Sequence, residues 1–232
     1  VLVVTQMALS IMLLIGAGLF GVNLRSAMSL EKGFVSDNVL TAAMSPLLAG
    51  YSEPRAAEFY RRLTERLTAL PSVKSVGFVE ALPLGLNGSD GGVTIPGYVP
   101  AKNESMSIQY TMASPAYFTT MGTPLLRGRE FEARDDSSAT RVVVVNQRFV
   151  DRFWPGQDAI GKTVLRGQRP HTVIGVVATG KYKTLGEPPT AHIWYASAQS
   201  STFAMTAVIR LAGEPDAPTG TLRRQLAAID TK

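Results

Sequence analysis

The sequence contains no cysteine among its 232 residues. Disulfide bonds, thiolate metal ligands and cysteine nucleophiles are therefore excluded within this chain. Charged residues are also scarce, because they make up 18% of the chain, whereas soluble domains average about 25%. This shortage indicates that part of the chain lies away from water. Since the chain begins with Val1 rather than methionine, we expect it to be a piece of a longer protein.

Long runs of basic residues are also missing. The net charge is +5, and the basic residues are spread along the chain, with Arg61-Arg62 and Arg223-Arg224 as the longest Lys/Arg runs. A nucleic-acid-binding face needs a clustered basic patch. We therefore expect no nucleic-acid partner.

The first 24 residues carry no charge, and Arg25 is the first charged residue. A helix of this length spans roughly 36 Å, which exceeds the hydrocarbon core of a bilayer, about 30 Å thick. The sequence predicts a transmembrane helix with a short extension over residues 1–28. A signal peptide would need a basic leader, a shorter apolar core and a small-residue cleavage site. A buried core helix is the other alternative.

Small residues within this helix match a cofactor motif. Residues 16–21 read GAGLFG, which fits G-x-G-x-x-G. The dinucleotide motif follows a short strand and opens a helix, whereas about fifteen apolar residues precede this one. We expect no dinucleotide there. Small residues allow close approach of another membrane helix, so the helix-packing candidates are Gly16, Ala17, Gly18 and Gly21.

A second motif match raises the question of ATP binding. Residues 156–163 read GQDAIGKT and fit G-x-x-x-x-G-K-[ST], the phosphate-binding loop. That loop works between a strand and a following helix. Here a short predicted helix precedes it, and Gly167 and Pro170 leave no room for a helix after it. The sequence predicts a turn that leads into a strand.

The rest of the chain has the pattern of an α+β body. Ser52 is a plausible N-cap, Pro54 suits the first helical turn and Pro71 ends that helix. The glycine-rich stretch 82–92 is expected to be a flexible loop. Strands are predicted at 38–44, 73–79, 106–112, 142–145, 171–177, 191–195 and 203–211, and helices at 52–70, 115–121, 147–153 and 219–229.

Catalytic groupings are few. His171 and His192 lie on predicted strands without the spacing of a metal site, which needs three or four ligands. Asp135-Asp136 lies in a polar stretch and is expected to be a solvated loop. The sequence also has no G-x-S-x-G motif of a serine hydrolase. We expect no catalytic residue, no metal and no cofactor.

Several stretches resemble the MacB-type permeases, also called FtsX-like permeases, and especially their duplicated orphan branch. The similar stretches are QMALSIMLLIGAGLFGVNLRS at the first helix, SPAYFTTMGTPLLRGREF at 114–131, VVVVNQRFVDRFWPGQDAIGKTVL at 142–165 and VIGVVATGKYKTLGEPPTAHIWYASAQ at 173–199. Together they cover nearly the whole chain. Departures such as Ala116 and Gln147 put local turns in doubt, not the family.

The resemblance implies one membrane helix and the large extracytoplasmic domain of an ABC transporter permease in a bacterial inner membrane. It implies two lobes: a porter-like β-α-β lobe split between 38–80 and 201–232, which is truncated at its end, and a mixed lobe inserted at 81–200. The implied partners are the membrane, a separate cytoplasmic ATPase subunit or domain, a second permease half in a dimer and, in some members, a periplasmic adaptor. The domain would transmit ATP-driven motion to export without being an enzyme itself.

Two other interpretations stay open. A membrane-anchored extracytoplasmic sensor or binding module would need only this one helix, whereas a permease continues into more apolar spans. A phosphate-loop enzyme would require nucleotide binding that is lost in Lys162→Ala.

Overall fold

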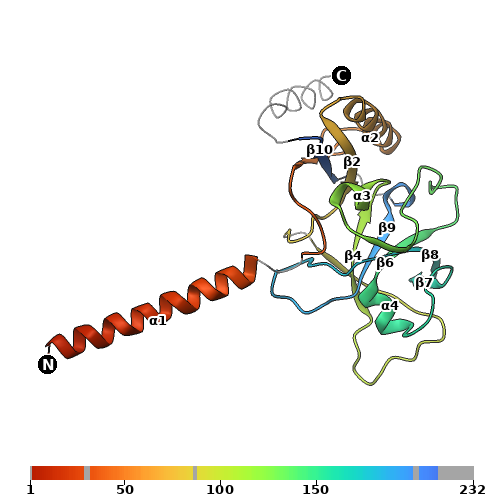
Figure 1. The fold of residues 1–232 in the computed structure, drawn as a ribbon. Coiled ribbons are helices and arrows are strands. Elements are labelled where there is room, and N and C mark those ends of the chain that lie inside the picture. Colours follow the sequence, from red (N-terminus) through yellow and green to blue (C-terminus); the bar gives the residue numbers. More distant parts are fainter. Residues whose placement is uncertain (1, 29–31, 86–87, 201–203, 214–232) are drawn as a thin grey trace.

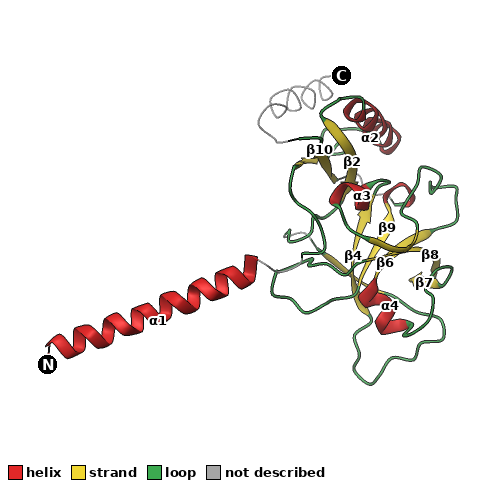
Figure 2. Ribbon diagram, in the orientation of Figure 1, coloured by secondary structure: helices red, strands yellow, loops and turns green. Residues whose placement is uncertain are grey.

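The structure, a computed structural model, describes residues 2–28, 32–85, 88–200 and 204–213 (Figure 1). These residues form a long apolar helix and a body of short helices on a mixed sheet, as Figure 2 shows. The α+β class expected from the sequence is confirmed. The helix expected at 219–229 lies outside the described residues.

The described helices are few, and the longest stands at the start of the chain. They are α1 (Leu2–Met28), α2 (Glu53–Thr68), α3 (Tyr117–Met121), α4 (Gln147–Phe153) and a short 3-10 turn, η1 (Ser197–Gln199). Ser52 is the N-cap residue of α2 and Pro54 lies in its first turn, as expected, but the Ser52 side chain makes no capping bond. The Ser52 carbonyl instead accepts from the Ala56 amide at 2.8 Å.

Ten strands form one sheet in the described part of the chain, in the order β1-β10-β2-β4-β9-β6-β8-β5, with β3 beside β4 and β7 beside β8. Their bounds are β1 (Val39–Met44), β2 (Val73–Val79), β3 (Ser89–Gly92), β4 (Ser107–Ala113), β5 (Leu125–Gly128), β6 (Val142–Asn146), β7 (Thr163–Arg166), β8 (Arg169–Val177), β9 (His192–Ala196) and β10 (Met205–Leu211).

The strand from the end of the described chain lies between two strands from its beginning. β10 pairs antiparallel with both β1 and β2, so β1 and β2 run parallel to each other. The connecting helix α2 has an apolar stripe and packs on this part of the sheet. Its Leu63 and Leu67 are fully buried in one cluster with Phe78 of β2 and Ile209 of β10.

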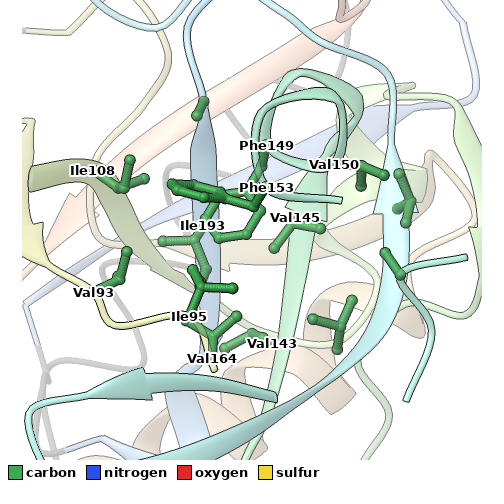
Figure 3. Packing of buried hydrophobic residues seen from close by; sticks show 14 of the residues in the cluster. Val93, Ile95, Ile108, Val143, Val145, Phe149, Val150, Phe153, Val164 and Ile193 are labelled. Carbon is green, nitrogen blue, oxygen red and sulfur yellow. The ribbon is translucent and has the colours of Figure 1, made fainter. Parts of the chain in front are cut away.

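A second core lies over the middle of the sheet (Figure 3). Phe149, Val150 and Phe153 of α4 pack against Val145 of β6 and Ile193 of β9. All five side chains are buried. The wholly apolar run at β6 suits a strand that is covered on both faces, as the sequence predicted.

These two parts of the sheet meet at a narrow junction. β2 and β4 share a single residue pair, Val79 with Ala113. The Ser114 hydroxyl supports the junction by accepting from the Phe78 amide at 2.8 Å. One ladder pair and its neighbouring bonds therefore join β1-β10-β2 to the other strands.

The prediction of a flexible loop at 82–92 is wrong for its last four residues. Residues 89–92 form β3, which pairs antiparallel with β4. The packing is close at Gly91, because a Cβ there would lie 2.9 Å from Cε1 of Tyr110 and would require this ring to shift. The glycines therefore permit a strand beneath an aromatic ring.

The short strands β5 and β7 were not predicted. The sequence of β5, LLRG, has no alternation of apolar and polar residues that would predict a strand. All four of its residues are exposed. β7 forms a hairpin with β8, and only Val164 of its four residues is buried. Both strands are defined by their pairing with β8.

Candidate functional site

Helix α1 is long and apolar enough to cross a membrane over Leu2–Val22, and no other helix among the described residues meets that test. No part of this window is buried in the chain. Uncharged apolar side chains such as Leu2 and Leu14, 84% and 72% exposed, are unfavourable in water. Transfer of such side chains into the hydrocarbon core of a bilayer is favourable, which makes α1 a candidate membrane span.

The helix-packing candidates are exposed on α1. A Cβ placed on Gly16, Gly18 or Gly21 would meet no atom within 4 Å outside the helix backbone. At about 100° per residue, Ala17, Gly18 and Gly21 lie within roughly 100° of one another, and Gly16 lies about 100° beyond Ala17. These positions leave space for a second helix, and their packing role remains a prediction.

The residues that follow α1 are fixed to the body. We call residues 32–38 the linker segment. The Lys32 carbonyl accepts from the Lys181 amide at 3.0 Å. Gly33 has a φ of +78°, and a Cβ there would lie 3.0 Å from both Gly180 N and Thr179 O, and closer still to Gly180 Cα. Only glycine fits this backbone contact without a shift.

Arg210 of β10 fixes the middle of the linker segment. Its Nη2 donates to the Val35 carbonyl at 2.8 Å, its Nη1 to the Asp37 carbonyl at 3.2 Å and its Nε to the Thr120 carbonyl at 2.7 Å. The planar guanidinium can serve several acceptors at once. One side chain therefore joins β10, the end of α3 and the linker segment.

Further contacts hold the linker segment at both ends. The Val35 amide donates to the Met121 carbonyl, and the Leu211 amide donates to the Asn38 carbonyl, each at 2.8 Å. The Phe34 side chain packs against the buried cluster that contains Phe118 and Trp194. The chain leaving α1 thus contacts β10 and the segments around α3 and 179–181.

Sequence reasoning missed this junction. Arg210 is a charged residue inside an otherwise apolar or small run, MTAVIRL, and that contrast was the available indication. The partnership of Gly33 with Gly180 left no pattern, because the two residues are far apart in the sequence.

The GQDAIGKT stretch forms the turn that the sequence predicts. Gly156 and Gly161 have φ values of +70° and +82°, and the strand β7 follows in place of a helix. The backbone amides are used internally, since Gly161 N donates to Val173 O at 2.8 Å and Lys162 N to Ala159 O at 3.1 Å. Lys162 Nζ donates to Gln157 Oε1 at 2.8 Å. This arrangement lacks the cradle that binds phosphates.

The two histidines lie on strands, as expected. His192 is buried, stacks on Tyr182 with ring centroids 4.2 Å apart and has no hydrogen-bond partner for either ring nitrogen. Burial lowers the pKa of His192 to about 3, so the ring is neutral near neutral pH. His171 Nδ1 lies 3.0 Å from the Arg169 carbonyl. Within the described ranges, no group of three or more His, Cys, Asp or Glu residues could hold a metal ion.

Asn146 connects the strands beneath the helix α4. Its Oδ1 accepts from the amides of Phe149 and His192, each at 3.0 Å. Its Nδ2 donates to the Tyr182 hydroxyl at 3.0 Å and to the Thr190 carbonyl at 2.8 Å. The buried Asn146 amide thus accepts two hydrogen bonds and donates two. We read it as structural, because these bonds fix the relative position of three segments.

The expectation of a solvated Asp135-Asp136 loop is wrong for Asp135. That residue is buried, and Arg129 contacts both carboxylate oxygens at 2.7 and 2.8 Å. This hydrogen-bonded partner lowers the pKa of Asp135. Asp136 is exposed and accepts from the Ser138 amide in a local turn. The pair is therefore structural, and sequence alone did not identify the arginine partner.

The comparisons with known proteins agree on one family. A family model described as the MacB-like periplasmic core domain matches residues 1–228. The macrolide export ATP-binding/permease protein MacB of Neisseria gonorrhoeae is 33% identical over 81 residues, which are 35% of this chain and 13% of that protein. A probable export ATP-binding/permease protein MacB of Pseudomonas entomophila is 37% identical over 81 residues, 34% of this chain and 12% of that protein.

Solved structures share the fold. The periplasmic region of MacB from Actinobacillus actinomycetemcomitans aligns with a TM-score of 0.57 at 16% identity, covering 86% of this chain and 87% of that one. The extracellular domain of the transporter YknZ from Gram-positive bacteria aligns with a TM-score of 0.50 at 15% identity, covering 82% of this chain and 91% of that one. The family model spans nearly the whole chain, and the chain therefore belongs to the MacB-like periplasmic core domains of ABC transporter permeases.

Proposed function

We propose that this chain is the first membrane helix and outer domain of an exporter permease, and that it passes ATP-driven movement from the membrane to the outer domain. The observation that carries this proposal is the fixed linker segment. Backbone hydrogen bonds and the Arg210 guanidinium hold residues 32–38 against the body. A displacement that reaches Lys32 therefore acts directly on the body.

The domain division expected from the sequence identifies the two lobes that the linker segment contacts. We propose that 1–28 is the membrane helix with its extension, that 38–80 and 201–232 form a porter-like lobe and that 81–200 is the inserted lobe. The position of β10 between β1 and β2 supports that division. The linker segment then touches both lobes, through Arg210 on one side and Gly180 and Met121 on the other.

The driving partner is proposed to be a cytoplasmic ATPase, either separate or in the same polypeptide. The names of the relatives, macrolide export ATP-binding/permease proteins, support an ATP-driven exporter. We also propose an inner-membrane location with the body outside, a dimer of permease halves and, in keeping with the family, a periplasmic adaptor. Membership of the duplicated orphan branch also stays a prediction. The domain itself carries no catalytic step in this proposal.

Spin-label distances in the full-length transporter test the transmission. A cysteine introduced at Val99, which is 88% exposed, carries the label in a cysteine-free background. The expected result is a change in the label-to-label distance across the dimer when ATP is added. Gly33→Ala should abolish or broaden that change without preventing ATP hydrolysis. Gly50→Ala is the matched control, because Gly50 also has a positive φ, +81°, but an added Cβ meets nothing within 4 Å.

Two results would overturn the proposal. One is a label distance in the unaltered protein that does not respond to ATP. The other is an equal loss of response in Gly33→Ala and Gly50→Ala, which would indicate general destabilisation rather than a broken linkage.

The membrane-anchored sensor or binding module remains the second candidate, since one apolar helix would suffice for it. The length of the complete gene separates the two. Further apolar spans after residue 232 would favour the permease, and a protein that ends with this domain would favour the sensor.

A further inference from the structure

A pocket of about 430 Å³ opens on the body at one end of the central strands, near the start of β8 and the ends of β4 and β9. Drug-sized ligands occupy pockets from about 300 Å³ upward. Its lining residues are Met112, Arg141, Arg166, Arg169, His171, Tyr195, Ala196, Gln199 and Ser200. Neither the GQDAIGKT turn nor the linker segment contributes to it.

Three arginines line this pocket. Arg166 and Arg169 are directly paired across the β7–β8 hairpin, and Arg141 precedes β6 on the neighbouring strand. Among the described residues, no carboxylate lies within ion-pair distance of any of the three. Three cationic side chains around one pocket, none of them in an ion pair with a described residue, attract an anion.

One of the three arginines is already oriented. The Arg166 guanidinium lies over the ring of Tyr110, 4.4 Å from its centroid, and over the ring of Tyr195, 4.7 Å from its centroid. Stacking on two aromatic rings fixes the plane of the guanidinium and leaves its N–H edge for an acceptor. Less side-chain freedom is then lost when an anion binds.

The Gln199 side chain is held in place next to Arg141. The Gln199 side chain donates to the carbonyls of Asp136 and Thr140, at 3.1 and 3.0 Å, and accepts from the Val142 amide at 3.0 Å. Met112 and Tyr195 are buried and give the pocket an apolar floor. The pocket therefore combines a cationic rim with an apolar surface.

Two further titratable groups face the arginines. Burial lowers the pKa of His171, and the nearby guanidinium groups of Arg141 and Arg166 lower it further, so the ring adds no charge near neutral pH. Glu80 is half-buried, and burial raises the pKa of its carboxyl while Arg166 lowers it. Even with Glu80 ionised, the three arginines would leave the pocket with a net positive charge.

We propose that this pocket binds a small amphiphilic anion, a phosphate monoester or carboxylate with an apolar body, through Arg141, Arg166 and Arg169. The anionic group would take charge-assisted hydrogen bonds from the guanidiniums. The apolar body would lie on Met112 and Tyr195. This proposal needs neither ATP nor a dimer, and it stands apart from the proposed transmission of movement.

Calorimetric titration of the purified protein with phenyl phosphate tests the site, with phenol as the neutral probe. Phenyl phosphate should bind at least about tenfold more tightly than phenol. Arg141→Gln and Arg169→Gln should each weaken phenyl phosphate binding by about tenfold. Arg166→Lys keeps the charge and should still lose about fivefold, because the ammonium cannot stack or fork in the same way.

Arg148→Gln is the matched control. Arg148 is exposed on α4, beyond the opposite end of β6, and its loss changes the net charge equally. It should change affinity by less than about twofold, since exposed charges at that distance are screened by salt. Equal affinity for phenol and phenyl phosphate would overturn the proposal, and so would equal losses in Arg148→Gln and the pocket variants.

A second titration distinguishes the source of the anion. A short-chain phosphatidic acid presents the same phosphate monoester on a lipid. Tighter binding of this lipid than of phenyl phosphate, lost in Arg169→Gln, would identify a lipid headgroup. Tighter binding of phenyl phosphate would identify a soluble anion.

Discussion

Gly33 and Gly180 meet through their backbones, because a Cβ on Gly33 would lie 3.0 Å from Gly180 N and closer to Gly180 Cα. The contact joins Gly33, in the linker segment on the C-terminal side of α1, to a segment more than half the chain away. A Cβ on Gly180 would in turn lie 2.9 Å from the Lys32 carbonyl oxygen, so neither glycine can gain a side chain without a shift of the facing backbone.

The first prediction concerns the contact of Gly33 with Gly180. Gly33→Ala adds left-handed strain of about 1–2 kcal/mol and a backbone clash, so we expect a total loss of about 3 kcal/mol in the free energy of unfolding. Gly50→Ala adds only the strain and should cost about 1 kcal/mol. Urea unfolding followed by the fluorescence of Trp154 and Trp194 measures both. Equal costs would show that the Gly33–Gly180 contact is not tight.

The second concerns Arg210. Arg210→Gln removes bonds to the carbonyls of Thr120, Val35 and Asp37, and we expect a loss of about 2–3 kcal/mol. Hydrogen exchange at the Val35 amide, which bonds Met121, should also accelerate.

Arg134→Gln serves as the control for Arg210. Arg134 forms a surface ion pair with Glu132 and is 68% exposed, so its loss should cost below about 0.5 kcal/mol. Unchanged exchange at Val35 in Arg210→Gln would show that the guanidinium does not hold the linker segment.

The third concerns pH. The pKa of His192 is lowered to about 3 in the folded protein, against about 6.5 in an unfolded chain. Between these values the unfolded state takes up a proton that the folded state does not. Stability is therefore complete above about pH 6.5 and falls as the pH drops, by up to about 1.4 kcal/mol per pH unit.

His192→Phe keeps a ring beside Tyr182 and Trp194 and removes this proton uptake. The free energy of unfolding should then fall less steeply between about pH 6.5 and pH 4. Carboxylates held by arginine, such as Asp135, add an acid-side slope that both proteins share. Parallel curves for the two proteins would contradict a neutral buried His192.

The fourth concerns the small residues of α1. Gly18→Leu fills space beside Ala17 and Gly21 and should weaken the association of the full-length protein in detergent by about tenfold. Leu19→Met changes an apolar residue about 160° around the helix from Ala17 and Gly21 and should have little effect. Sedimentation equilibrium measures both. Unchanged association in Gly18→Leu would exclude this face as a packing surface.

Much of the fold followed from local patterns. The run at Val142–Val145 had only apolar residues and became a buried strand, and the stripe of α2 gave the helix and its buried face. The predicted helix before the GQDAIGKT stretch, and Gly167 and Pro170 after it, were enough to reject a phosphate-binding loop. In each case the deciding information lay within a few neighbouring residues.

The remaining features depend on contacts between distant residues. Gly91 lies in a strand because it pairs with Ile108 of β4, and the buried Asp135 carboxylate is paired with Arg129. Arg210 bonds the carbonyls of Val35 and Asp37 in the linker segment, which lie more than 170 residues earlier in the sequence. No pattern within a single segment records such pairings, so they required the structure.

The most direct test of the account is the side of the membrane on which the body lies. A membrane-impermeant maleimide is added to spheroplasts that contain the full-length protein with Val99→Cys in a cysteine-free background. A cysteine placed in the cytoplasmic ATPase reports leakage. We predict that Val99→Cys is labelled in intact spheroplasts and that the ATPase cysteine is not. Labelling of Val99→Cys only after lysis would place the body in the cytoplasm and contradict the proposed transporter function.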